Sequence, residues 1–182
     1  MPPRIARIVP SALALALVAC GGGANAPSAP APPPGAAAAP AVSPLEARMA
    51  PDFELKDVNG NTVHLSDSQG TVRLVDFWTT WCSLCREEIP MFKGLHAAYA
   101  AKGLTLVGIA MDDGGASIVK PFVDENQIPY LTLIGSDPVA TSFGGVVGFP
   151  TKFLVDREGR IVETWIGPVP RAVLEKRIQA LL

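Results

Sequence analysis

Hydrophobic and polar positions follow two different periods along the chain, and the changes between them predict the order of its elements. TVRLVDFW at 71–78 and LTLVGIAM at 104–111 are β-branched, apolar runs typical of buried strands. From 83 to 101 the apolar residues stand three and four positions apart, which predicts a helix with one buried face. A second helix is expected over 118–125, followed by a short strand and a helical turn before residue 144.

Both ends of the folded part carry hairpin patterns. In DFELKDVNGNTVHL at 52–65, two short strand patterns flank Asn59-Gly60, a strong signal for a two-residue turn. TKFLVD and IVETWI flank a tight turn at 157–160, and RAVLEKRIQALL at 171–182 is typical of an amphipathic helix. The order predicts an α/β fold with a mixed central sheet flanked by helices and an N-terminal β-hairpin extension.

The first fifty residues follow neither period. Arg4 and Arg7 precede a short apolar run that stops at Cys20, as in a secretory signal, and the run is shorter than the roughly 20 residues of a membrane-spanning helix. Residues 21–50 are mostly Ala, Pro and Gly and cannot bury enough apolar surface to form a core. Because proline favours extended backbone of ~3.1 Å per residue, we expect a disordered, semi-rigid tether here.

The end of the apolar run, LVAC at 17–20, resembles the lipobox of bacterial lipoproteins. That resemblance implies cleavage before Cys20 and acylation of its thiol and new amino group, so that lipid anchors the protein to a membrane. An ordinary signal peptide with an incidental Cys20 is the alternative. We therefore expect a signal peptide at 1–19, a lipidated cysteine and tether at 20–50, and one domain at 51–182 outside the cytoplasm.

Length and charge add limits to the possible functions. A chain of 182 residues is long enough for one domain of ordinary size. Its formal net charge is −2, and removal of the two arginines with the signal makes the mature protein more acidic. This charge gives no reason to expect a nucleic-acid partner.

The stretch FWTTWCSLCREEIP at 77–90 holds two of the three cysteines, Cys82 and Cys85. A bridge between them would close a very small loop and remove little entropy from the unfolded chain, so a purely structural disulfide is the weaker interpretation. A C-x-x-C pair where a strand meets a helix in an α/β protein indicates a thioredoxin-like redox motif. Disulfide exchange is therefore the first functional hypothesis.

Three motifs occur in the expected order for one family, namely APDFELKDVNG, VDFWTTWCSLCREEIP and VVGFPTKFLVDREGRIV. On these motifs the chain resembles the TlpA/ResA-like branch of extracytoplasmic thiol–disulfide oxidoreductases, over residues 51–182. The resemblance implies a thioredoxin-like fold and a monomer that reduces disulfides in selected proteins, with apocytochrome c and copper-site proteins as the usual substrate classes. It also implies that a membrane thiol-reducing protein recharges the dithiol, and that no bound cofactor or metal is needed.

The two cysteines have different expected roles. Cys82 begins the helix, where the amide groups and the helix dipole favour a thiolate, so we expect it to be the exposed nucleophile. Cys85 lies one turn further, and we expect it to be more buried and to resolve the mixed disulfide. The dipeptide Ser83-Leu84 lacks the proline that many relatives carry before the second cysteine. Pro90 removes a helical amide donor and is expected to kink the helix.

Two carboxylates are candidates for moving the proton. Asp76 stands in an otherwise apolar strand, where burial would raise its pKa, and it matches the buried aspartate of thioredoxins. Glu88 follows Cys85 by three residues on the same helix face and matches the active-site glutamate of the ResA-like branch. The alternatives are a hydrogen-bonded strand-end residue for Asp76 and a solvated helix position, beside Glu87, for Glu88.

The substrate-binding side of the site is expected from the second motif and from one tryptophan. By resemblance, the Phe149–Pro150 peptide bond is cis and lies opposite the cysteine pair, with Thr151 beside it. Trp81, next to the nucleophile, is expected to face the substrate, whereas Trp78 is expected to belong to the core.

Two rival functions use similar sequences. Copper-delivery proteins on this fold carry C-x-x-x-C and a distant histidine; here the spacing is one residue shorter and His96 lies ~16 Å along the helix from Cys85. His64 is better explained as a hairpin-surface residue.

A peroxiredoxin-like peroxidase is favoured by Thr79, three residues before Cys82, but the proline that peroxidases place earlier is replaced by Val75. Rapid oxidation of Cys82 by hydrogen peroxide would identify that class.

Overall fold

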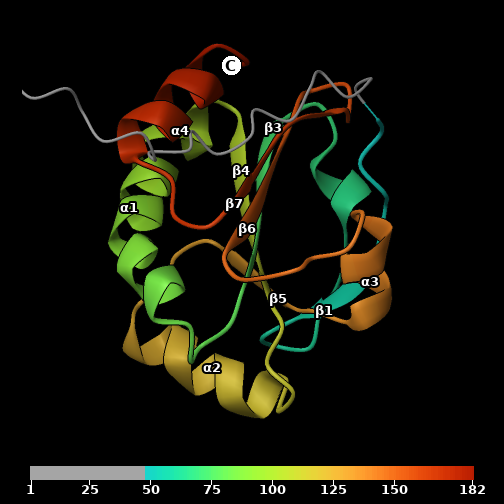
Figure 1. Cartoon of the computed structure of the whole chain (residues 1–182), viewed down its shortest axis with the longest axis vertical. Coiled ribbons are helices and arrows are strands. Elements are labelled where there is room, and N and C mark those ends of the chain that lie inside the picture. The colour runs from blue at the N-terminus through green and yellow to red at the C-terminus, as the bar shows by residue number, and fades with distance from the viewer. Residues whose placement is uncertain (1–47) are drawn as a thin grey trace, which may run out of the picture. The chain divides into compact units, whose positions relative to one another are not determined.

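The computed structural model describes residues 48–182, which form a seven-stranded mixed sheet with helices on both faces (Figure 1). The strand order is β2-β1-β5-β4-β3-β6-β7, in which β4 runs parallel to both β3 and β5 and the other neighbours are antiparallel. The strands are β1 Glu54–Asp57, β2 Thr62–His64, β3 Val72–Trp78, β4 Leu104–Ala110, β5 Leu131–Ile134, β6 Thr151–Val155 and β7 Ile161–Ile166. The predicted α/β class and mixed sheet are confirmed.

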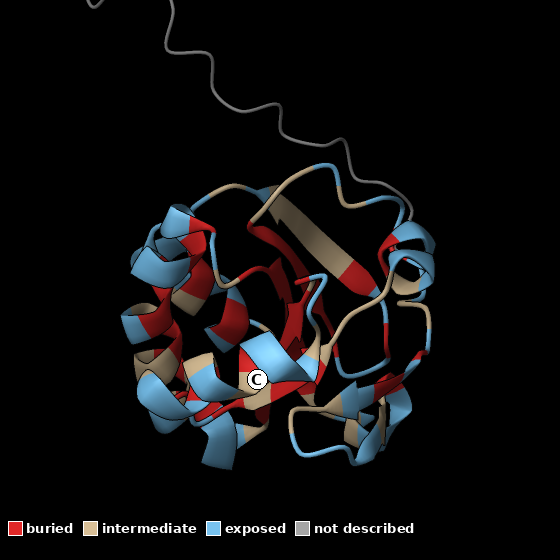
Figure 2. Ribbon diagram, turned by 90° about the horizontal axis from the view of Figure 1, so that it is seen from below, coloured by how far each residue is buried: buried red, intermediate tan, exposed pale blue. Residues whose placement is uncertain are grey.

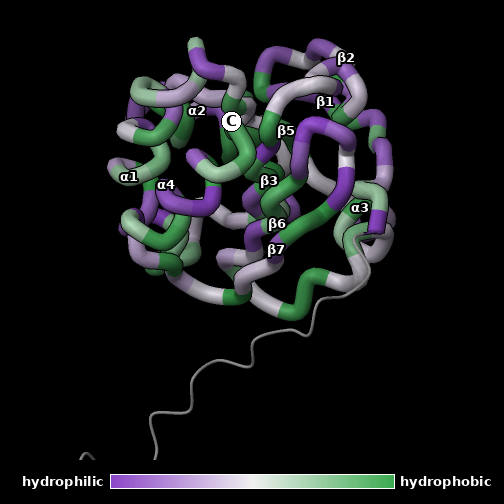
Figure 3. The backbone as a smooth tube through the Cα atoms, turned by 90° about the horizontal axis from the view of Figure 1, so that it is seen from above, coloured by the Kyte–Doolittle hydropathy of each residue, from purple (hydrophilic) through white to green (hydrophobic). Residues whose placement is uncertain are grey.

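Two apolar layers hold the helices to the sheet. The α-helices are α1 Ser83–Tyr99, α2 Ala116–Glu125, α3 Asp137–Ser142 and α4 Arg171–Gln179, and two short 3₁₀ helices are η1 Leu65–Ser68 and η2 Ala100–Lys102. Buried residues of α1, α2 and α4 pack on one face of the sheet, and residues of α3 and η1 pack on the other. Buried positions concentrate along the sheet and the inward helix faces (Figure 2), and hydrophobic segments gather in the middle of the sheet (Figure 3).

The central strand β3 decides which side chains reach the helix that carries the cysteines. All seven of its residues are buried, as expected for a strand with a neighbour on each side and helices on both faces. Because side chains alternate between the faces of a strand, Leu74 and Trp78 pack with α1, whereas Val75 and Phe77 pack toward α3. Asp76 shares the parity of Leu74 and Trp78, and its side chain therefore lies on the α1 face.

Two details differ from the sequence predictions. The first hairpin exists, but the Asp57 amide donates to the Asn61 carbonyl, so three residues rather than two form its loop. Gly60, at φ +89, supplies the left-handed residue that such three-residue loops need. Residues 48–50, which the sequence analysis assigned to the tether, pair with the β6–β7 turn; for example, the Ala50 amide donates to the Gly159 carbonyl.

The long helix α1 continues through Pro90, which lies inside it. Among residues 48–182, no helix is both long enough and apolar enough to cross a bilayer. The predicted signal peptide at 1–19 and the tether up to residue 47, with Cys20, lie outside the described residues.

Candidate active site

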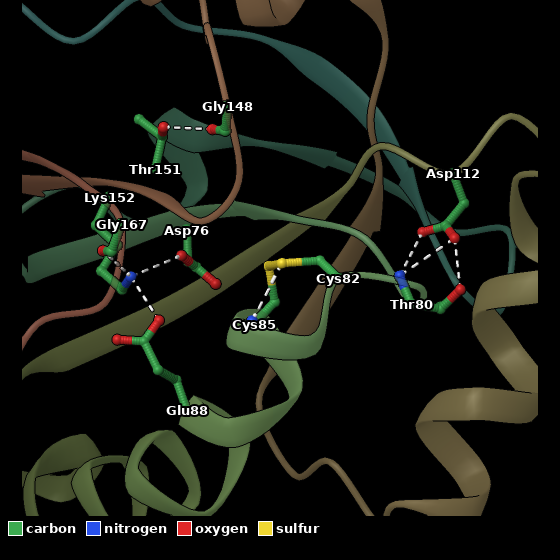
Figure 4. The surroundings of a disulfide bond; sticks show 10 residues. All are labelled: Asp76, Thr80, Cys82, Cys85, Glu88, Asp112, Gly148, Thr151, Lys152 and Gly167. Carbon is green, nitrogen blue, oxygen red and sulfur yellow. Dashed lines mark hydrogen bonds and ion pairs between the residues drawn. A yellow bond between two sulfur atoms is a disulfide. The ribbon is translucent and has the colours of Figure 1, made fainter.

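Cys82 and Cys85 are joined by a disulfide at the N-terminus of α1 (Figure 4). Cys82 is the N-cap residue, and its sulfur accepts a hydrogen bond of 3.2 Å from the Cys85 amide. The expectation that Cys82 is exposed is wrong for this oxidised state, since its exposed fraction is 8% against 3% for Cys85. The Cys82 sulfur is bonded to Cys85 over the first helical turn, and Cys82 lies within the apolar layer. Cys82 is nevertheless the more accessible of the pair.

Asp112 holds the loop that leads from β3 to Cys82. Its carboxylate accepts hydrogen bonds from the Thr80 amide at 3.0 and 3.2 Å and from the Thr80 hydroxyl at 2.5 Å (Figure 4). Asp112 follows β4, and β4 is hydrogen-bonded to β3, so the carboxylate joins two loops at the same edge of the sheet. The sequence analysis did not identify Asp112, because its partner lies 32 residues away in the chain.

A buried lysine lies between the two predicted carboxylates. Lys152 of β6 is directly opposite Asp76 of β3 in the antiparallel register, so both side chains lie on the same face. The Lys152 Nζ is 3.8 Å from Asp76 Oδ1 and 2.6 Å from Glu88 Oε2, and it donates to the Gly167 carbonyl at 3.2 Å. The exposed fractions are 0% for Lys152, 4% for Asp76 and 6% for Glu88, so this cluster is almost entirely removed from solvent.

Burial dominates the electrostatics of Asp76. The pKa of Asp76 is raised to about 8, mainly by loss of solvation; the positive charge of Lys152 partly opposes this increase, and the negative charge of Glu88 adds to it. A carboxyl group that titrates there can exist in either protonation state near neutral pH. The alternative in which Asp76 is an ordinary hydrogen-bonded strand-end residue is wrong, since its Oδ1 has no hydrogen-bond partner within the described residues.

Glu88 is also buried, and its solvated-helix alternative is wrong. Its Oε1 accepts a hydrogen bond of 3.0 Å from the Val169 amide, in the segment between β7 and α4. Glu87, one residue earlier, is exposed. The turn of the helix therefore separates two adjacent glutamates, one toward solvent and one toward the sheet.

Apolar residues that reach the surface, Trp81, Val147 and Phe149, form a group that we call the apolar rim; Trp81 is next to Cys82 in the chain. Trp81 is 70% exposed, and its ring meets the Phe149 ring edge-on at a centroid distance of 6.1 Å. Val147, two residues before Phe149, is 83% exposed; it was not identified from the sequence, because loop valines carry no distinguishing pattern. Trp78 is buried, as expected. These side chains offer a surface on which an apolar segment of a protein can pack beside the cysteines.

The second motif lies beside this rim. The Phe149–Pro150 bond is cis, as expected. Thr151, in contrast, is 2% exposed, and its hydroxyl donates to the Gly148 carbonyl at 2.7 Å. This side chain therefore stabilises its own loop, and the binding of substrate by Thr151 stays a prediction. Within residues 48–182, no three His, Cys, Asp or Glu side chains are grouped closely enough to hold a metal ion.

Comparison with known proteins points to one chemistry. Residues 47–164 match the model of the AhpC/TSA family. The chain is 32% identical over 126 residues to the thiol-disulfide oxidoreductase ResA of Bacillus thuringiensis (strain Al Hakam), which covers 69% of this chain and 72% of that protein.

Solved structures agree with the sequence comparison. The chain matches a candidate thiol:disulfide interchange protein DsbE from Chlorobium tepidum with a TM-score of 0.69 and 32% identity, over 74% of this chain and 96% of that one. It also matches a secreted thiol-disulfide isomerase from Corynebacterium glutamicum with a TM-score of 0.67 and 26% identity, over 72% and 84% of the two chains. The predicted thioredoxin-like fold is confirmed.

Proposed function

The chain belongs to the AhpC/TSA family and is a thiol–disulfide oxidoreductase of the ResA type, and from this premise we propose that it reduces disulfides of proteins outside the cytoplasm while tethered to a membrane. One observation carries most weight: a disulfide at a helix N-terminus, with the exposed Trp81 next to it in the chain and buried carboxylates on the same helix and the neighbouring strand. The secreted relative from Corynebacterium glutamicum supports the location.

The first chemical step is attack by the Cys82 thiolate on a substrate disulfide. The helix N-terminus stabilises this thiolate, and Cys82 is the more accessible cysteine. A bond forms between Cys82 Sγ and one substrate sulfur, the substrate S–S bond breaks, and the other substrate sulfur leaves as a thiolate that takes up a proton.

The second step releases the substrate. The Cys85 thiol gives its proton to a neighbouring carboxylate, for which Asp76 and Glu88 are the candidates, and its thiolate attacks Cys82 Sγ. The mixed disulfide breaks, the Cys82–Cys85 disulfide forms, and the substrate leaves with both sulfurs reduced. Two electrons have then passed from the protein dithiol to the substrate, so a further dithiol must recharge the pair; we assign this to a membrane thiol-reducing protein.

The direction of electron flow is tested by a redox titration of the Cys20→Ser chain, which retains only the active-site cysteines, against defined thiol buffers. We expect a two-electron midpoint near or below about −250 mV, in the thioredoxin range of reductants. A midpoint near about −120 mV, the value of a strong oxidant, would reverse the proposed direction. The absence of any two-electron transition would favour the copper-binding alternative.

The membrane tether rests on the sequence of residues 17–20. We expect the mature wild-type protein to enter the detergent phase on extraction, with acyl groups on Cys20 by mass spectrometry. The Cys20→Ser variant should partition into the aqueous phase, because it lacks the thiol that carries the lipid. A wild-type protein that is aqueous and unmodified at Cys20 would contradict the tether and leave the redox chemistry unaffected.

A further inference from the structure

The cluster behind the disulfide holds one cation and two carboxyl groups. If Asp76 and Glu88 were both ionised, Lys152 would neutralise only one of them, and a net negative charge would remain in a site almost closed to solvent. An uncompensated buried charge is unfavourable, so the cluster is expected to retain one proton near neutral pH. The question is which carboxyl group carries it.

The two carboxyl groups differ in their contacts with Lys152 and with backbone amides. Glu88 lies 2.6 Å from the Lys152 Nζ and also accepts the Val169 amide hydrogen, and both contacts favour its ionised form. Asp76 lies at 3.8 Å from the same nitrogen, and no backbone amide of the described residues donates to it. Geometry alone therefore favours an anionic Glu88 and a proton on Asp76.

Among residues 48–182, few titratable groups face Asp76. From α1 these are Glu88 and the cysteine pair, and from β6 it is Lys152; the β4 residue paired with Asp76 is Gly108, which has no side chain. The buried Tyr130, next to β5, completes the set; burial and the two nearby carboxyl groups raise the pKa of its hydroxyl, which stays neutral. In Figure 4 the Asp76 carboxyl group lies between the Lys152 ammonium and the disulfide.

We propose that Lys152 is a positioning residue for disulfide exchange: it holds Glu88 as a fixed anion and leaves Asp76 as the group that exchanges a proton with Cys85. The role in exchange rests on the proposed function, whereas the assignment of the proton does not. The ionised fraction of Asp76, which has given its own proton to solvent, acts in the second chemical step: the Cys85 S–H bond breaks, the proton bonds to an Asp76 oxygen, and the sulfur keeps the electron pair with which it attacks Cys82. Asp76 then returns the proton to the departing substrate thiolate.

The proposal predicts opposite effects of two substitutions on one titration. In the oxidised protein, ¹³C NMR of the Asp76 carboxyl group should show an inflection near pH 8. Glu88→Gln removes the competing anion, so that Lys152 pairs with the Asp76 carboxylate alone. The pH of the inflection should therefore fall by about 1 unit or more. Lys152→Met removes the cation, so the inflection should rise by about 1–3 units. The pH dependence of exchange with dithiothreitol should move in the same two directions.

Exposed neighbours provide matched controls. Glu87→Gln removes a charge one residue from Glu88, and Lys120→Met removes the lysine of a surface pair with Asp124; neither should move the inflection. A merely structural effect of the two cluster substitutions would not shift the pKa of Asp76 in opposite senses. If Lys152→Met does not fold, the test rests on Glu88→Gln. In that case the proposal is overturned if the pKa of Asp76 rises, or if it falls by less than about 0.3 unit.

The carboxyl titration involves no substrate, so it separates two kinds of failure. Opposite shifts in a protein that reduces no protein disulfide would contradict the proposed function and leave the assignment of the proton intact. If the two substitutions shifted the pKa of Asp76 in the same direction while the protein still reduced protein disulfides, the role of Lys152 would be overturned and the function would remain. An inflection near pH 8 that persists in Asp76→Asn would show that another group carries the proton.

Discussion

Replacing Cys82 with serine should lower the reduction of insulin disulfides by about 10³-fold or more, the scale on which loss of a covalent nucleophile acts. The serine hydroxyl is not ionised at the helix N-terminus, so no bond to the substrate sulfur can form. Turnover with dithiothreitol as the electron source measures the effect, in the Cys20→Ser background so that no other thiol is present.

The matching substitution at Cys85 should have a different outcome. Cys85→Ser retains the nucleophile and lacks the thiol that resolves the intermediate, so a mixed disulfide with substrate should accumulate. Mass spectrometry under non-reducing conditions should locate that bond at Cys82. Accumulation in Cys82→Ser instead, with the bond at Cys85, would exchange the roles of the two cysteines.

Asp76→Asn should stabilise the protein at alkaline pH and slow exchange. The pKa of Asp76 is raised from 3.8 to about 8 in the folded protein, so the folded state binds the proton more tightly than the unfolded state between these values. The contribution of Asp76 to stability is therefore fully present below about pH 4 and is lost as the pH rises through 8, by an amount on the order of several kcal/mol. Asparagine carries no charge at any pH, and it leaves Lys152 paired with Glu88 alone.

Urea unfolding of both proteins at several pH values tests this result. The difference in the free energy of unfolding should be small near pH 4 and should favour the variant above pH 8. Because the variant lacks the group that we propose as the base for Cys85, exchange should slow by about 10²-fold, at the lower end of the range for general bases. A difference that does not change with pH would contradict the buried, titrating Asp76.

Several site residues could be predicted because local patterns carry them. The C-x-x-C spacing at a strand-to-helix junction identified Cys82 and Cys85, an acidic residue in an apolar strand identified Asp76, and helical spacing placed Glu88 on the face of Cys85. The exposure of Trp81 was also expected, and at 70% it is confirmed.

Lys152 was missed, although a signal for it exists. It stands between buried residues in TKFLV, a strand in which all five residues are buried. Lysine is almost never fully buried without a partner, so a lysine in such a strand points to a hidden carboxylate. Identifying that carboxylate requires the β3–β6 register, which joins residues 76 positions apart in sequence.

The order of strands and helices, the redox pair and its place at a helix start can be predicted from the sequence, because they depend on hydrophobic period, turn residues and short spacings. Three contacts become visible only in the folded protein: one lysine pairs with two carboxyl groups, Asp112 holds the loop before Cys82, and the Thr151 hydroxyl bonds to its own loop. The physical reason is distance along the chain. Charges interact through space, and strand pairing brings together groups that no local pattern relates.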